Sequence, residues 1–157
     1  NISFEQNEKR IAFDISPVNT VLNFYANTLG FAYDDKGKIA SVYMNRIATG
    51  MKLQADPTVK FAMKNFALTR ILHGHLKYDS PFNTYQNTGL PPGPICTPSI
   101  KTIDAVLDAP QTNYIYFVAK PDFNGYSNFA SGYAEHLVYA KAYQQALDSL
   151  IKAKANK

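Results

Sequence analysis

Residues 38–63 read KIASVYMNRIATGMKLQADPTVKFAM and predict two helices joined by a short turn. Apolar residues recur at helical spacing in Lys38–Ala48, which predicts a helix whose apolar face carries Ile39, Val42, Tyr43 and Ile47. Gly50 lies just beyond this pattern and is typical of a helix end. Asp56 followed by Pro57 is typical of a helix start, with Asp56 as the N-cap, and predicts a second helix that ends near Met63.

Upstream of this stretch, Ser16 and Pro17 repeat the start signal, and the apolar spacing that follows predicts a helix that ends at Gly30. Residues 1–12 are polar and predict either a helical lead-in or a frayed end. A further helix is expected near Thr69.

Downstream, residues 79–98 hold five prolines and two glycines, which excludes a regular helix or a central strand. Ser99 then predicts a helix cap, followed by inward-facing residues Ile100, Ile103, Val106 and Leu107. Tyr114–Ala119 is the best strand, and a long closing helix is marked by Leu137, Ala140, Leu147 and Ile151. We therefore predict an α+β fold: one domain over residues 1–157, with several helices packed on a small β-sheet.

Composition excludes several function classes. The 157 residues carry 16 Lys and Arg against 12 Asp and Glu, a net charge of +4, and only three of the basic residues are arginines. Such dilute charge argues against a nucleic-acid partner. The single cysteine, Cys96, excludes an internal disulfide and a multi-cysteine metal site. No apolar run approaches the roughly 18 residues that a membrane span needs.

The segments SPFNTY (80–85) and GLPPGPI (89–95) are the most unusual in the chain. Prolines and glycines fix the backbone, while Asn83 and Tyr85 add neutral hydrogen-bonding groups, a mixture that suits sugar hydroxyls and amides better than phosphate. A rigid surface loop that only supports the fold explains the same residues equally well.

Other polar residues leave two interpretations open. His73 and His75 have a spacing that a metal site on a strand could use, but solvated or capping histidines explain them better, and we expect no metal. Arg46 emerges from an apolar helix face, and a salt bridge, for example to Asp56, is at least as good an explanation as a ligand clamp.

Seven pieces of the sequence together resemble one family, the endolytic murein transglycosylases or YceG-like proteins. In chain order they are Asn45–Ile47, Gly50–Met51, Leu53–Val59, Ser80–Tyr85, Gly89–Ile95, Tyr116–Ala119 and Glu135–His136. The match runs from about Ile39 to Tyr143, and the longer runs suggest a Bacteroidetes-like branch.

The resemblance implies a function and a location. Members are held in the inner membrane by an N-terminal helix, and they cut peptidoglycan glycan strands on its periplasmic face without water, metal or cofactor. A glutamate protonates the glycosidic oxygen, and the 6-hydroxyl of the muramic acid attacks to leave a 1,6-anhydro end. The chain opens on Asn1 rather than Met, so we expect it to be part of a longer, N-terminally anchored protein.

The chain departs from the family pattern at the acid. The position of the family glutamate falls at Asn27 or Thr28, neither of which can donate a proton as an acid. The chain holds three glutamates, namely Glu5, Glu8 and Glu135. Ser127 stands where the family commonly has a histidine, and Phe82 where it has a tyrosine.

Three hypotheses follow from this departure. The chain is an active lytic transglycosylase whose acid lies elsewhere, an inactive relative that binds glycan strands or cell-wall synthesis enzymes, or a purely structural module. Asp34 or Asp35 could replace the acid, although a solvated surface pair explains these two residues better. In the first two hypotheses, the residues expected to bind the glycan are Asn45, Arg46, Gln54, Asp56, Asn83, Tyr85 and His136.

Overall fold

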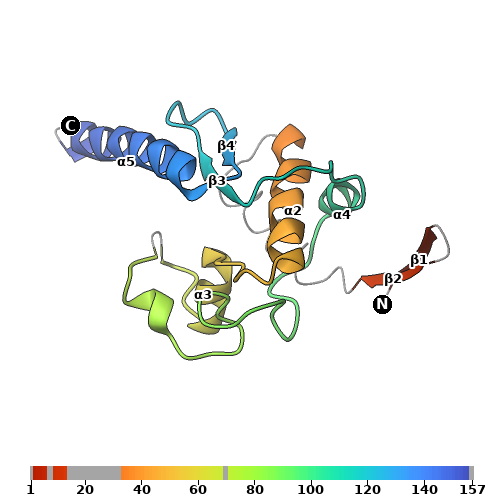
Figure 1. Ribbon diagram of the computed structural model, residues 1–157. Helices are drawn as coiled ribbons and strands as arrows, with labels where there is room; N and C mark the ends of the chain where they lie inside the picture. The colour runs from red at the N-terminus through yellow and green to blue at the C-terminus, as the bar shows by residue number, and fades with distance from the viewer. Residues whose placement is uncertain (1, 7–8, 14–32, 69–70, 156–157) are drawn as a thin grey trace.

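The structure is a computed structural model that describes residues 2–6, 9–13, 33–68 and 71–155 (Figure 1). Along the chain it contains β1 (Ile2–Gln6), β2 (Lys9–Phe13), α2 (Tyr33–Ala48), α3 (Asp56–Ala62), the short 3-10 turn η1 (His75–Lys77), α4 (Ile100–Leu107), β3 (Tyr116–Ala119), β4 (Ser127–Ala130) and α5 (Tyr133–Ala155). Helices with short antiparallel strands confirm the predicted α+β class. The helix predicted up to Gly30, with Asn27 and Thr28, lies outside the described residues.

Helix α2 forms the centre of the core. Its residues Ile39, Ala40 and Tyr43 are buried against Leu53 and Ala55, which precede α3. The predicted apolar face is therefore confirmed for Ile39, Val42 and Tyr43, whereas Ile47 is exposed. The helix begins at Tyr33, more than a turn earlier than predicted. The helix ends as predicted, because Gly50 has a φ of +70°, a left-handed conformation that glycine adopts at little cost.

Strands β3 and β4 form an antiparallel hairpin in which Phe117 pairs with Phe129. The ring of Phe117 meets Tyr43 of α2 edge to face, with ring centroids 5.9 Å apart. Helix α5 contacts both strands, so the hairpin lies between α2 and α5 (Figure 1). This arrangement is the small sheet that the sequence predicts, with its first strand beginning at Tyr116 instead of Tyr114.

Helix α3 starts differently from the prediction. Its N-cap is Ala55, no side chain of the described residues caps it, and Pro57 occupies the first turn as expected. The carboxylate of Asp56 is not the cap, because it accepts a hydrogen bond from the Tyr85 hydroxyl at 2.6 Å. The predicted cap is therefore wrong, and the Asp56 carboxylate bonds a group 29 positions away instead.

Helix α4 confirms the predicted cap and part of the predicted face, since Val106 packs against the core. Ser99 Oγ accepts the backbone N–H of Thr102 at 3.3 Å. Thr102 is fully buried, whereas Ile100 is 77% exposed and Leu107 is also exposed, so those two residues do not face inward. The helix turns Thr102 toward the core because the threonine hydroxyl is satisfied locally by Ser99, at 2.9 Å.

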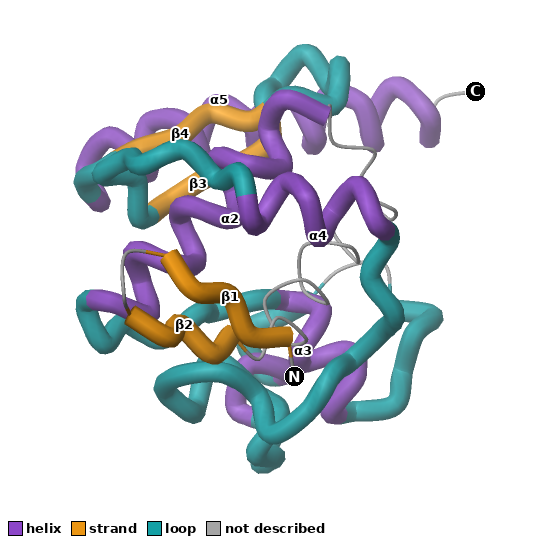
Figure 2. Tube along the Cα trace, turned by 90° about the vertical axis from the view of Figure 1, so that its right-hand side faces the viewer, coloured by secondary structure: helices purple, strands orange, loops and turns teal. Residues whose placement is uncertain are grey.

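The segment between α3 and α4 is irregular, as its prolines predict, and contains only turns and η1 in the part that the structure describes. The prediction of a helix that begins near Thr69 is therefore wrong for the described residues that follow, from Ile71 onward. Figure 2 shows this segment as a long looping tube below α2. It is held from inside by Asn83, a fully buried side chain.

The two ends of the chain form regular structure. Strands β1 and β2 pair antiparallel, with Phe4 opposite Ile11, so the described residues of this region form neither a helical lead-in nor a frayed end. Helix α5 confirms the predicted closing helix and runs away from the other elements toward the C-terminus (Figure 1). Leu137 and Ile151 are both exposed on it. None of the helices in the described ranges is both long and apolar enough to span a membrane.

The packing of the core predicts how much stability is lost when a large buried side chain is removed. Tyr43→Ala should lower the free energy of unfolding by about 3 kcal/mol or more, because Tyr43 is 2% exposed and contacts Phe117. Urea unfolding followed by circular dichroism measures this change. Tyr126→Ala, at an exposed tyrosine, is the matched control and should cost about 1 kcal/mol or less. Equal losses in the two variants would contradict the placement of the core.

Candidate functional site

Asn45, in the last turn of α2, fixes the segment that leads into β3. Its side-chain amide donates to the carbonyl oxygens of Thr112 at 2.8 Å and of Tyr114 at 2.9 Å. Both donors of the amide are therefore used inside the protein. The structure gives Asn45 a supporting position, at the wall of the region described below.

Arg46 joins three parts of the chain. Its Nε donates to the carbonyl of Ile115 at 2.6 Å and its Nη1 to the carbonyl of Leu53 at 2.7 Å, while the guanidinium lies 5.3 Å from the ring centre of Tyr116. Arg46 is 7% exposed. Backbone carbonyls thus satisfy this buried cation, in place of the carboxylate of Asp56 that the sequence suggested.

The start of α3 and the 80–85 segment are joined by hydroxyl groups. Thr84 Oγ1 accepts the backbone N–H of Ala55 at 3.0 Å and lies 2.9 Å from Thr58 Oγ1. The backbone N–H of Gln54 donates to the Thr84 carbonyl, and Gln54 adopts a φ of +52° with its side chain exposed. These buried bonds set the position of the next residue, Tyr85, against α3.

Asn83 holds the same segment through hydrogen bonds of its buried side chain. Its amide donates to the carbonyls of Leu76 and Tyr78, at 3.1 and 2.7 Å, and its Oδ1 accepts the N–H of Tyr85 at 3.0 Å. The side chain has no exposed surface. In this structure Asn83 therefore positions Tyr85 instead of offering its own amide to a ligand.

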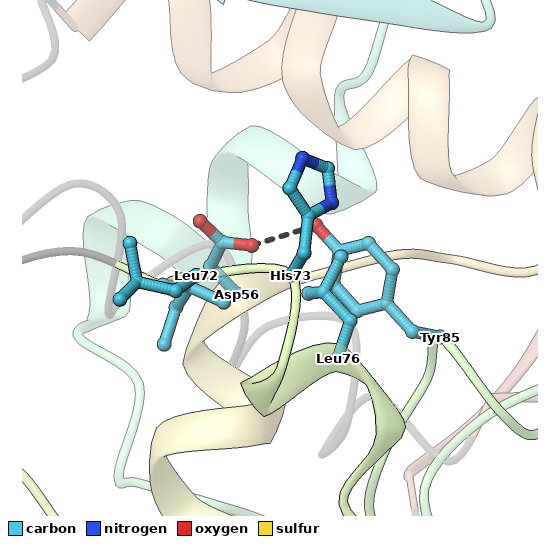
Figure 3. A pocket seen from close by; sticks show the side chains of 6 residues that line it. Asp56, Leu72, His73, Leu76 and Tyr85 are labelled. Atoms are coloured by element: carbon cyan, nitrogen blue, oxygen red, sulfur yellow. Dashed lines mark hydrogen bonds between the residues drawn. The ribbon is translucent and has the colours of Figure 1, made fainter.

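These supports bring Tyr85 and Asp56 together at a pocket. The phenol hydroxyl donates to Asp56 Oδ1 at 2.6 Å, from two residues that are 29 positions apart. The pocket has a volume of about 260 Å³, and its other lining residues are Ile71, Leu72, His73 and Leu76 (Figure 3). It therefore combines polar side chains with apolar ones.

Burial sets the protonation of this pair. It raises the pKa of Asp56 above 3.8, against the opposing effects of the Tyr85 hydrogen bond and the positive charge of Lys60. Burial and the negative charge of Asp56 raise the pKa of Tyr85 as well, so the phenol stays protonated. Ionising Asp56 therefore costs free energy in the folded state, and this cost appears as the pH rises above 3.8.

A second cluster contains His136, at the start of α5. Its ring stacks on Tyr116 of β3, with centroids 5.0 Å apart and planes inclined by 21°. Burial, followed by the positive charge of Arg46, lowers the pKa of His136, so the ring is neutral near pH 7. His136 Nδ1 is buried and has no hydrogen-bond partner among the described residues.

The other titratable candidates have structural roles or lie away from the pocket. Asp35 is buried and accepts the backbone N–H of Ser127, and Glu135 is exposed and accepts the hydroxyl of Tyr139 at 3.0 Å. His75 Nδ1 accepts the backbone N–H of Leu72 at 3.2 Å. Within the described ranges, no three or more His, Cys, Asp or Glu residues gather as metal ligands would.

Sequence reasoning missed part of this region. It did not select His73 or the leucines beside it as pocket residues, and it did not select Tyr116 or Tyr133. The aromatic richness of the chain, 11 tyrosines and 10 phenylalanines, was the available signal. It could not say which rings meet, because Tyr116 and Tyr133 come from different elements.

Known families and solved structures match most of this chain. The model of the YceG-like family matches residues 31–142, a range that contains Asp56, Tyr85 and His136 but begins after Asn27 and Thr28. A crystal structure of a YceG-like protein from Listeria monocytogenes superposes with a TM-score of 0.67 at 35% identity, over 76% of this chain and 36% of that one.

Curated relatives carry one name. An endolytic murein transglycosylase of Bacillus subtilis is 45% identical over 102 residues, which are 65% of this chain and 28% of the relative. An endolytic murein transglycosylase of Streptococcus pneumoniae is 33% identical over 94 residues, which are 57% of this chain and 17% of the relative. The match therefore spans well under half the length of each relative.

The hydrogen bond in the pocket predicts how the pKa of Asp56 changes when Tyr85 loses its hydroxyl group. Tyr85→Phe removes the hydroxyl that donates to Asp56, and because that bond lowers the pKa of Asp56, its loss should raise the pKa of this carboxyl further. Carbon-13 NMR titration of the aspartate carboxyl groups measures the change. Tyr126→Phe should leave the titration of Asp56 as it is. An Asp56 pKa that is equal or lower in Tyr85→Phe would contradict the hydrogen bond.

Proposed function

Because this chain belongs to the YceG-like family, we propose that it binds the glycan strands of murein, the peptidoglycan of the bacterial cell wall. Relatives named endolytic murein transglycosylases support the proposal. The observation that carries it is the pocket at Asp56 and Tyr85, whose lining residues all fall within the range that matches the family.

The chemistry of the pocket suits an N-acetylated sugar. A pyranose ring presents hydroxyl and amide groups at its edge and C–H groups on its faces. The oxygens of Asp56 and Tyr85 can bond the edge, while Leu72 and Leu76 can cover a face. The carboxyl group of Asp56 disfavours a phosphate ligand, because two negative charges would then share a half-buried site.

Cleavage of the strand needs a proton donor, and we propose Asp56 for this role. It lines the pocket, and burial raises its pKa, which favours the protonated form that an acid requires. The proton would pass to the glycosidic oxygen as the bond from C1 to that oxygen breaks. The 6-hydroxyl oxygen of the muramic acid would bond to C1, and its proton would return to the Asp56 carboxylate.

Binding without cleavage is the second candidate function. The resemblance to the family implies that the position of its acid falls at Asn27 or Thr28, which favours this second function. The described glutamate, Glu135, lacks the partly apolar setting of an acid, because it is exposed and hydrogen-bonded to Tyr139. In that case the domain would hold glycan strands for cell-wall synthesis enzymes. Either function is expected on the periplasmic face of the bacterial inner membrane, where nascent glycan strands lie.

Binding is tested by co-sedimentation of the full-length protein with purified sacculi. Tyr85→Ala removes a hydroxyl and a ring from the pocket and should weaken binding about tenfold or more. Tyr126→Ala is the control and should bind like the unsubstituted protein. Because the chain carries a net charge of +4, both are also measured at raised ionic strength. Equal binding by Tyr85→Ala and the control would contradict the pocket.

Cleavage is tested by digestion of the same sacculi and mass spectrometry of the released muropeptides. We expect 1,6-anhydro ends from the unsubstituted protein and at least about a 10²-fold loss in Asp56→Asn, which keeps an oxygen that can accept from Tyr85. Sacculus binding by Asp56→Asn controls for folding. Anhydro products that persist in Asp56→Asn would place the acid elsewhere. An unsubstituted protein that binds but yields none would support the second candidate.

A further inference from the structure

Three aromatic rings meet at the start of α5, outside the pocket. Tyr116 of β3 contributes one ring, whose centroid lies 5.0 Å from that of His136 and 5.8 Å from that of Tyr133. Tyr133 and His136 are 6.4 Å apart and lie one turn from each other on α5. We call Tyr116, Tyr133 and His136 the aromatic platform.

The platform is open on one side. Tyr133 is 60% exposed, whereas Tyr116 and His136 are half-buried beneath it. Contacts from two other rings hold the Tyr133 side chain, so its exposed ring loses little conformational freedom when a ligand packs on it. A tyrosine held in this way offers a flat apolar face beside a hydroxyl group.

The platform favours a neutral ligand. Burial and the nearby Arg46 keep His136 uncharged, and the guanidinium of Arg46 is itself buried and bonded to backbone carbonyls. An anionic group would therefore find no exposed cation among these residues. The neutral face of a sugar ring fits a surface made of aromatic faces and hydroxyl groups.

One buried side chain links the platform to the segment that carries Asp56. The guanidinium of Arg46 lies 5.3 Å from the ring centre of Tyr116 and donates to the carbonyl of Leu53 at 2.7 Å, three positions before Asp56. Figure 1 shows the start of α5 on the side of α2 that also faces α3.

We propose that the aromatic platform is a second sugar-binding site, in which Tyr133 stacks on a pyranose ring of the same N-acetylated glycan strand that occupies the pocket. This inference rests on the proposed function. It assigns the ring of Tyr133, and not its hydroxyl, to the contact, with Tyr116 and His136 as positioning residues that hold the ring in place.

The test measures binding of the full-length protein to sacculi and to soluble oligomers of N-acetylglucosamine. Tyr133→Leu should weaken both about tenfold, while Tyr133→Phe, which keeps the ring, should retain binding within about twofold. Tyr143→Leu, a tyrosine farther along α5 that packs on Phe123, is the matched control and should bind normally. Circular dichroism of each variant checks that α5 is intact.

The outcomes separate this proposal from the proposed function. Normal binding by Tyr133→Leu, together with weak binding by Tyr85→Ala, overturns the platform and leaves the pocket in place. Loss of binding in Tyr133→Phe as well as Tyr133→Leu overturns the stacking contact, because the hydroxyl would then carry the interaction. Absence of any glycan binding by the unsubstituted protein overturns both proposals.

Discussion

The rest of the site depends on the hydrogen bonds that the buried guanidinium of Arg46 donates. This guanidinium reaches from α2 to the carbonyl of Leu53, ahead of α3, and to the carbonyl of Ile115, ahead of β3. A buried cation that lost these acceptors would be strongly unfavourable, so the three segments are held together by the need to satisfy one charge. The bond to Leu53 positions the start of α3, which carries Asp56 of the pocket. The bond to Ile115 positions the next residue, Tyr116.

Local signals predicted much of the fold. The spacing of Ile39 and Tyr43 gave a correct core face, and Ser99 was correctly assigned as a cap, because both depend on neighbours within one or two helical turns. Asp56 was assigned wrongly as a cap, because its partner, Tyr85, lies 29 positions away and competes successfully for the carboxylate. Thr102 was missed as an inward residue because its hydroxyl is satisfied by Ser99 and so can be buried.

The candidate site was predicted as a set of residues rather than as an arrangement. Asn83 and Tyr85 are adjacent enough to be selected together, but the structure gives them unlike positions: Asn83 is buried and holds the backbone, while Tyr85 reaches the pocket. Sequence spacing cannot separate a supporting amide from a ligand-facing phenol when both lie in one irregular segment. Likewise, Tyr133 has no sequence signal, because its partner ring belongs to β3.

The position of the carboxyl groups decides what chemistry this scaffold can support. Asp35 is buried, where it accepts the backbone N–H of Ser127, and Glu135 is exposed, so neither combines access with an apolar setting. Asp56 has both, since it lines a pocket and burial opposes its ionisation. The protonated phenol of Tyr85 then has a double effect: its hydrogen bond fixes the direction of the carboxyl group, and it moderates the rise in the pKa of Asp56. A group that must both give and recover a proton needs such a balance, because a pKa far from the working pH impairs one of the two steps.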